Sequence, residues 1–123
     1  MLTCRSSEGV DEVEGHRLVE LKTQEEMNER MAAAKHFFVL FWSNTNSISA
    51  HSFHQWALLS EQLSTADTPD TVLAHVACHH SIEMCDNLRP VDLYTVVAYK
   101  DGTNIGSTSN IGDVDYYRSW ATL

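Results

Sequence analysis

Residues 37–56 read FFVLFWSNTNSISAHSFHQW, and this stretch predicts a strand, a turn and a helix in succession. The run from Phe37 to Trp42 is continuously apolar and has the length of a strand that is buried on both faces. A polar turn without Gly or Pro follows it. A helix is expected to begin near Ser49, because Phe53 and Trp56 then lie on one helical face.

The composition limits the class of protein and of partner. A chain of 123 residues, 43% of them hydrophobic, is long enough to close one core without additional cross-links. The formal net charge of −9 argues against nucleic acid or an anionic membrane surface as partner, since both require a basic face. The longest apolar run, Phe37 to Trp42, is far too short to insert into a membrane.

The remaining elements can be predicted on both sides of this stretch. Residues 1–15 are polar and acidic, which predicts a flexible N-terminal segment or linker, and residues 16–123 form the expected domain. Arg17–Leu21 is a candidate edge strand. Thr23–Glu26 is a capping box that opens a helix ending near Ala34.

The spacing of apolar residues predicts seven more elements, counting the strand and the helix of residues 37–56. They are a strand over His36–Trp42, a helix over Ser49–Leu63, a strand over Val72–Cys78, a helix over Ile82–Leu88, strands over Tyr94–Tyr99 and Ile105–Ser109, and a helix over Asp113–Ala121. Asp101-Gly102 is expected to be the hairpin turn between the last two strands. The order β-α-β-α-β-α-β-β-α predicts an α/β domain, with a mixed sheet of about five strands flanked by helices on both faces.

Three motifs keep a common register along the chain. Phe41-Trp42 leads into the polar turn, Val76-Ala-Cys78 is followed by Cys85, and residues 95–102 read TVVAYKDG. Together they resemble thioredoxin-like domains of the protein disulfide isomerase family, which carry Phe-Tyr, Val-Asp-Cys…Cys and Pro-Thr-strand-Asp-Gly at the corresponding places. The resemblance covers roughly residues 17–121 and implies a thioredoxin-like fold.

The chain departs from that family at the catalytic motif. Active members carry Cys-x-x-Cys at the start of the helix, and counting from Phe41 the four positions fall on Asn46, Ser47, Ile48 and Ser49. A domain without these thiols cannot exchange disulfides there. Asn46, Ser47 and Ser49 also suit ordinary roles as turn residues and helix caps.

Two other positions of the family site differ as well. The residue at the place of the family's cis-proline is Tyr94, and a trans Leu93–Tyr94 bond is expected because a cis bond without proline costs about 2.5–4 kcal/mol. The buried acid that precedes the motif in active members corresponds to Leu40. These changes favour a catalyst that has lost its function.

The cysteines leave three alternatives. The resemblance implies a structural disulfide between Cys78 and Cys85, but two free thiols or a regulatory or catalytic pair are also open. The third cysteine, Cys4, either pairs with a neighbouring module or is free.

Histidines are plentiful in the middle of the chain, and we interpret them as a dispersed, solvated set. They are His51, His54, His75, His79 and His80. Imidazole and thiolate are suitable zinc ligands, but His79, His80 and Cys85 do not have the spacing of a standard site. No metal and no cofactor are therefore expected.

The resemblance implies a redox-inactive thioredoxin-like module, not an enzyme, in protein folding in the endoplasmic reticulum lumen. Such modules bind polypeptide clients or partner proteins, or space neighbouring domains of a larger chain. The expected groove lies between the Asn44–Ser49 turn and the Leu93–Tyr94 loop, with Asn46, Ser49, Leu93 and Tyr94 as candidate peptide-binding residues.

The residues are also compatible with another function and with other compartments. The main alternative function is a thiol-disulfide oxidoreductase that cycles through Cys78 and Cys85. Secretion or a cytoplasmic location are the alternative compartments, and a cytoplasmic protein would hold its cysteines reduced.

Overall fold

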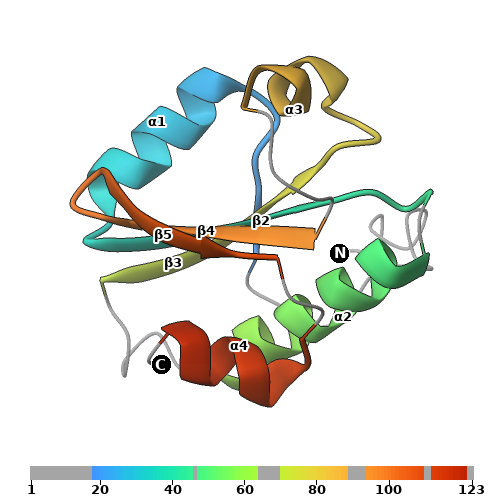
Figure 1. The fold of residues 1–123 in the computed structure, drawn as a ribbon. Coiled ribbons are helices and arrows are strands. Elements are labelled where there is room, and N and C mark those ends of the chain that lie inside the picture. The colour runs from blue at the N-terminus through green and yellow to red at the C-terminus, as the bar shows by residue number, and fades with distance from the viewer. Residues whose placement is uncertain (1–17, 46, 64–69, 89–93, 110–111, 122–123) are drawn as a thin grey trace, which may run out of the picture.

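A mixed β-sheet organises the computed structural model of the chain, which describes residues 18–45, 47–63, 70–88, 94–109 and 112–121 (Figure 1). The linker predicted for residues 1–15 lies outside this range. The described residues form one five-stranded sheet with the order β1-β3-β2-β4-β5. Its strands are β1 (Val19–Glu20), β2 (His36–Trp42), β3 (Thr71–Ala77), β4 (Tyr94–Lys100) and β5 (Thr103–Thr108).

The sheet combines the two kinds of strand pairing that the element order predicted. β3 pairs in parallel with both β1 and β2, whereas β4 is antiparallel to β2 and to β5. The parallel pairs require crossover helices, and the antiparallel pair β4–β5 needs only a tight turn. This is the predicted α/β architecture.

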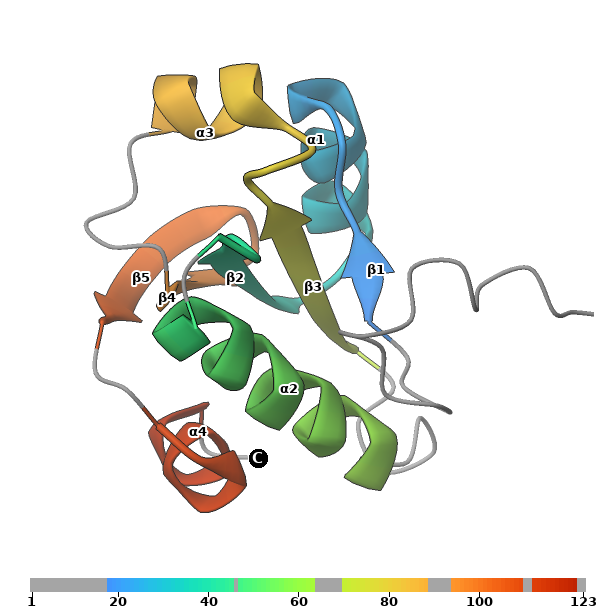
Figure 2. The ribbon, with the colours of Figure 1, turned by 90° about the vertical axis from the view of Figure 1, so that its right-hand side faces the viewer.

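Two helices cover each face of the sheet. In Figures 1 and 2, α1 and α3 lie on one side, and α2 and α4 lie on the other. Their bounds are α1 (Gln24–Ala33), α2 (Ser47–Gln62), α3 (Ile82–Leu88) and α4 (Val114–Ala121). None of the described helices is both long enough and apolar enough to cross a membrane.

Strand β2 is the centre of the core because it contributes side chains to both faces. Phe38, Leu40 and Trp42 pack into the cluster formed with α2 and α4. Phe37, Val39 and Phe41 alternate with them and pack into the cluster that contains Met27 of α1 and Met84 of α3. The prediction of a strand buried on both faces is therefore confirmed.

The start of helix α1 was predicted more closely than the start of α2. The Thr23 cap is confirmed, since the amide of Glu26 donates to Thr23 Oγ1 at 3.1 Å; Glu26 Oε1 accepts from the Lys22 amide at 2.9 Å, one residue before the amide used in a standard capping box. Helix α2 begins at Ser47, two residues before the predicted Ser49. Ser49 therefore lies inside the first turn of α2, and its hydroxyl accepts a hydrogen bond from the Ser43 amide.

The hairpin turn between β4 and β5 requires a glycine. Asp101 and Gly102 have φ of 52° and 83°, the pair of positive values that a two-residue type I′ turn needs. We expect Gly102→Ala to lower the free energy of unfolding by about 1 kcal/mol, measured by urea denaturation. A Cβ at Gly102 meets no heavy atom within 4 Å, so the cost is conformational.

The matched control for this prediction is Gly102→Asn. Asparagine tolerates positive φ better than alanine, so Gly102→Asn should lose clearly less stability than Gly102→Ala. Equal losses for the two variants would contradict the conformational explanation.

Candidate functional site

The candidate site lies at the end of the sheet where β2 and β3 finish and α2 begins. Ligands of open α/β sheets commonly bind beyond the carboxyl ends of parallel strands. Trp42, the last residue of β2, is directly opposite Tyr94, the first residue of β4, in the antiparallel register. The structure thus brings the two predicted walls of the groove, the turn after Trp42 and the start of β4, to one end of the sheet.

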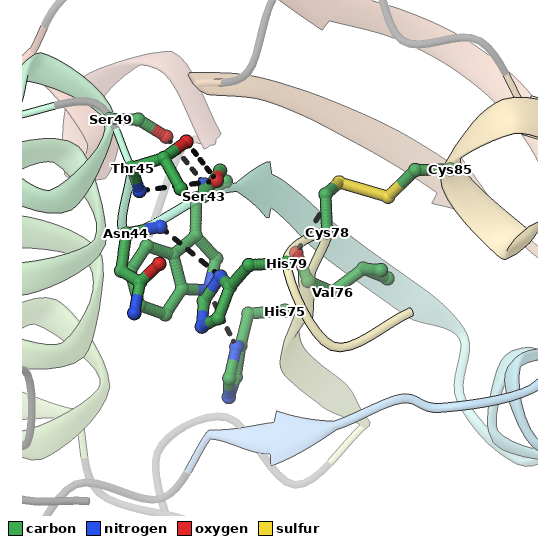
Figure 3. Close-up of a disulfide and its surroundings, with 10 residues drawn as sticks. Ser43, Asn44, Thr45, Ser49, His75, Val76, Cys78, His79 and Cys85 are labelled. Carbon is green, nitrogen blue, oxygen red and sulfur yellow. Dashed lines mark hydrogen bonds between the residues drawn. A yellow bond between two sulfur atoms is a disulfide. The ribbon is translucent and has the colours of Figure 1, made fainter. Parts of the chain in front are cut away.

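The turn after Trp42 is closed by serine and threonine hydroxyls (Figure 3). The amide of Ser43 donates to Ser49 Oγ at 2.8 Å, and the hydroxyls of Ser43 and Thr45 are 2.8 Å apart. The Thr45 amide also donates to Ser43 Oγ at 3.3 Å. Ser49 is fully buried at 0% exposure, so its hydroxyl fixes the turn and does not face solvent.

The other predicted site residues are distributed as follows. Ser47 and Ile48 are exposed in the first turn of α2, and the Ile48 side chain is 45% exposed. Tyr94 is half-buried. Asn46 and Leu93 lie outside the described residues, and with them the prediction of a trans Leu93–Tyr94 bond.

Leu40, the position that the resemblance assigns to a buried acid, lies in apolar surroundings. Leu40 is 0% exposed and belongs to the cluster shared with Trp42, Phe53 and Trp56. Leucine has no titratable group, so this position offers no proton acceptor to the site. A carboxylate in these apolar surroundings would also lack polar partners.

A disulfide joins Cys78 and Cys85 next to the turn (Figure 3). The sulfur atoms are 2.03 Å apart and the Cα atoms 5.7 Å apart, which connects the end of β3 to helix α3. Cys78 is also tied to the site through its backbone, because its amide donates to the Trp42 carbonyl at 2.7 Å. The disulfide therefore lies beside the site.

One histidine contacts the end of β2 and another contacts the turn that follows it, and the prediction of a solvated set is wrong for the first. His75 is only 6% exposed, and Trp42 Nε1–H donates to His75 Nδ1 at 3.0 Å. The Asn44 amide donates to His79 Nδ1 at 3.1 Å. A polar residue in a strand buried on both faces requires a hydrogen-bond partner, and this was the sequence signal that could have singled out His75.

Aromatic packing fixes the Trp42 ring between these groups. Trp42 stacks on Phe53 of α2 with centroids 4.1 Å apart and planes inclined by 10°. The His79 ring meets Trp42 edge-on at 5.0 Å, and the His75 ring lies 6.2 Å from Trp42. The other predicted histidines differ, since His51 and His54 are exposed on α2.

The histidines do not assemble a recognisable metal centre. Within the described residues, no group of three or more His, Cys, Asp or Glu side chains could hold a metal ion. The sulfur of Cys85 is bonded to Cys78, so it is not a thiolate ligand here. His80 Nδ1 lies 3.5 Å from Glu20 Oε2, an ion pair when the imidazole is protonated.

Comparisons by sequence find no matching family model and no matching curated protein. Comparisons by structure find many thioredoxin folds. A mutant thioredoxin from Halobacterium salinarum has a TM-score of 0.69 at 13% identity, with 89% of this chain and 92% of that one covered. A thioredoxin from Malassezia sympodialis has a TM-score of 0.71 at 13% identity, with 90% and 93% covered.

Human ERp44 is similar over one part of its length. Its TM-score is 0.75 at 15% identity, and the match covers 90% of this chain but only 30% of the ERp44 chain. At these identities the likeness concerns the fold alone. The chain therefore has a thioredoxin-like fold.

Proposed function

We propose that this chain is a redox-inactive thioredoxin-like module of the protein disulfide isomerase kind. In this proposal it binds polypeptide clients or partner proteins, or spaces neighbouring domains, during protein folding in the endoplasmic reticulum. It requires no cofactor.

One observation carries the proposal: the first turn of α2 has a buried serine, Ser49, at the position that the sequence resemblance assigns to the second thiol. Ser49 is 0% exposed, and its Oγ accepts the Ser43 amide. A hydroxyl in this arrangement cannot attack a disulfide, because that reaction requires a thiolate. The sequence supplies asparagine at the first thiol position, Asn46.

The site retains features suited to an extended polypeptide. Trp42 and Tyr94 lie opposite each other at one end of the paired strands β2 and β4. Ile48 exposes apolar surface beside the turn. An extended chain can pair its backbone with such loops, while apolar side chains settle against exposed residues such as Ile48. Asn46, Ser49, Leu93 and Tyr94 are the proposed binding positions, and Ser49 acts by holding the turn.

The proposed compartment follows from the cysteines. A disulfide such as Cys78–Cys85 persists in oxidising compartments, and the endoplasmic reticulum lumen is one of them. The chain corresponds to less than a third of ERp44, which supports a module within a larger protein.

The direct test is binding of an unfolded test protein. We expect the chain to bind fluorescently labelled α-lactalbumin that has been reduced and carboxymethylated. Both proteins are acidic, so charge attraction does not assist binding. Asn46→Ala combined with Tyr94→Ser, and separately Ile48→Ser, should each weaken binding about tenfold, measured by fluorescence anisotropy; this corresponds to about 1.4 kcal/mol.

The control for this test is Ile105→Ser on the edge strand β5. Ile105 is 59% exposed, comparable to Ile48, but lies on β5 and not beside the turn. Its replacement should leave the affinity within about twofold. Equal losses for Ile48→Ser and Ile105→Ser, or no loss for the Asn46 and Tyr94 pair, would count against the groove. Absence of any binding would favour a spacing role.

A second function is favoured by the position of the disulfide. Cys78 is bonded through its backbone to Trp42 beside the site, so reduction and reoxidation of Cys78–Cys85 could serve thiol exchange. Insulin reduction with thiol quantification separates the two functions. Turnover that disappears in Cys78→Ser would support the oxidoreductase and exclude the redox-inactive module.

A further inference from the structure

Two histidines of the site are restricted to one protonation pattern by the groups that donate to them. The donor to His75 Nδ1 is the indole N–H of Trp42, at 3.0 Å. The donor to His79 Nδ1 is the backbone N–H of Asn44, at 3.1 Å. An indole N–H and an amide N–H can only donate, so both Nδ1 atoms must be unprotonated.

Protonation would reverse the role of each Nδ1 atom. A doubly protonated imidazole is a donor at both nitrogens, so N–H would then face N–H and the bond would be lost. His75 cannot turn easily to water because it is 6% exposed and packs against Phe53, with centroids 4.8 Å apart. A charge on this buried ring would also be poorly solvated.

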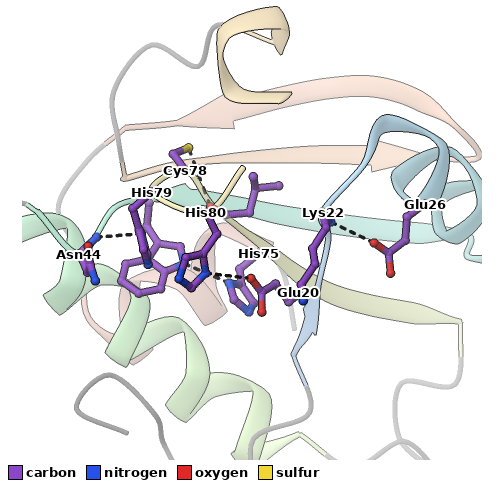
Figure 4. A network of polar contacts seen from close by, with 10 residues as sticks. Glu20, Lys22, Glu26, Asn44, His75, Cys78, His79 and His80 are labelled. Atoms are coloured by element: carbon purple, nitrogen blue, oxygen red, sulfur yellow. Dashed lines mark hydrogen bonds and ion pairs between the residues drawn. The ribbon is translucent and has the colours of Figure 1, made fainter. Parts of the chain in front are cut away.

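These two bonds hold the candidate site to strand β3 and the turn that follows it. Figure 4 shows His79 reaching Asn44, with His75 on the same side of the site. The bond from Trp42 fixes the end of β2, and the bond from Asn44 fixes the turn before α2. Both bonds connect residues far apart in the chain, with separations of 33 and 35 positions, so they are tertiary contacts and not properties of a local turn.

Two titratable side chains, Glu20 and His80, lie beside this pair. On β1, Glu20 is in register with His75, and its carboxylate lies 3.5 Å from His80 Nδ1. In the turn after β3, the His80 ring is 4.2 Å from that of His79. A charge on His80 would oppose a charge on His79, because like charges repel.

The neighbouring elements carry further titratable groups. Helix α2 presents Phe53 to His75, and its own histidines, His51 and His54, are exposed. On β4, Tyr94 pairs with Trp42, and on α3 the acidic side chains of Glu83 and Asp86 are exposed. The Trp42 ring beside His79 can partly offset the cost of a cation there.

We propose that His75 and His79 form a pH-sensitive latch that fixes the Asn44 turn near neutral pH and releases it on acidification. Because the closed turn requires neutral rings, its stabilisation is present above the ordinary titration range of histidine, near pH 6.5, and is lost as the pH falls. The consequence for polypeptide binding rests on the proposed function. A released turn must be ordered again on binding, which weakens affinity.

The latch itself is tested by NMR titration of the 15N-labelled chain from about pH 7.5 to about pH 5. The Trp42 indole N–H and the Asn44 amide should move away from their hydrogen-bonded positions with the same midpoints as the rings of His75 and His79. Circular dichroism should show that the fold persists across this range. Signals of Trp42 and Asn44 that stay constant while both rings titrate would overturn the proposal.

Asparagine supplies the decisive variant. Its Oδ1 occupies the place of a histidine Nδ1 relative to Cβ, accepts a hydrogen bond and does not titrate. The double variant His75→Asn, His79→Asn should therefore keep the Asn44 bond and lose its pH response. If the buried His75→Asn change impairs folding, His79→Asn alone should abolish the response at Asn44. The matched control is the variant His51→Asn, His54→Asn, in which two exposed histidines are replaced. Its Trp42 and Asn44 signals should show the same pH dependence as those of the wild type.

Binding provides the second arm of the test. Affinity for the carboxymethylated α-lactalbumin should fall about fivefold or more between about pH 7.5 and about pH 5.5, the lower range of ordinary coupling between two sites. The double asparagine variant should change less than about twofold. An equal pH response in wild type and variant would overturn the effect on binding. If the probe binds at neither pH, the proposed function fails, while the NMR titration still decides the latch.

Discussion

Replacing Trp56 by alanine is expected to lower the free energy of unfolding by about 3–5 kcal/mol, the usual range for deleting a buried aromatic side chain. Trp56 is 0% exposed at the centre of the cluster between the sheet and helices α2 and α4. Its ring meets Tyr117 edge-on at 5.3 Å, and its Nε1–H donates to the Ala74 carbonyl at 2.9 Å. The substitution removes both contacts and leaves a cavity under β3.

The hydrogen bond and the volume of Trp56 can be separated by a second variant. Trp56→Phe keeps most of the apolar volume and leaves the Ala74 carbonyl without its donor, so a loss of about 1–3 kcal/mol is expected. Tyr117 reports on the same region, since burial raises the pKa of its hydroxyl, an effect partly opposed by a contact with Ser52. Trp56→Ala opens the core around Tyr117 and should therefore lower the Tyr117 pKa toward its ordinary value, measured by absorbance titration.

Trp120 is the matched control for the alanine substitution. Trp120 lies on α4 and packs against the same core cluster, with its ring 6.3 Å from Phe38, but it is only partly buried. Trp120→Ala should therefore cost clearly less than Trp56→Ala in urea denaturation. Equal costs would show that Trp56 is not the more deeply buried of the two rings in this cluster.

Removing the disulfide is expected to lower the free energy of unfolding by about 2.5 kcal/mol, the value that the chain-entropy relation gives for so short a loop. The double variant Cys78→Ser, Cys85→Ser opens a link between residues seven positions apart. Because typical domains are stable by only about 5–15 kcal/mol, the transition should shift to clearly lower urea concentration.

Reduction provides an independent check of the same effect. Dithiothreitol should lower the stability of the wild type to that of the double serine variant and leave the variant unchanged. Cys4→Ser is the control, because the third cysteine does not take part in this disulfide. A wild type that is indifferent to reduction would contradict a stabilising role for the Cys78–Cys85 bond.

Much of the secondary structure could be predicted because its signals are local. The apolar run over His36–Trp42 and the periodic pattern over Ile82–Leu88 gave bounds that match β2 and α3. Asp101-Gly102 marked the hairpin. The start of α2 was predicted two residues late, since sequence spacing does not reveal that the Ser49 hydroxyl turns back to Ser43.

The candidate site was predicted only in outline. Matching motifs indicated which positions replace the family's thiols, and the structure places Ser49 and Tyr94 at one end of the sheet. The importance of His75 and His79 was missed because both were judged from composition and spacing along the chain. Their partners, Trp42 and Asn44, belong to a different strand and its turn.

The sequence by itself determined the order of the elements and the absence of sulfur from the helix start, because both depend on residue identity and short-range pattern. Only the tertiary structure decided the strand order, the contact of Cys78 with Cys85 and the bonds from Trp42 and Asn44 to the histidines. The physical reason is that β2 and β3 become neighbours through a parallel crossover, and the side chains at their carboxyl ends meet only after the core has packed.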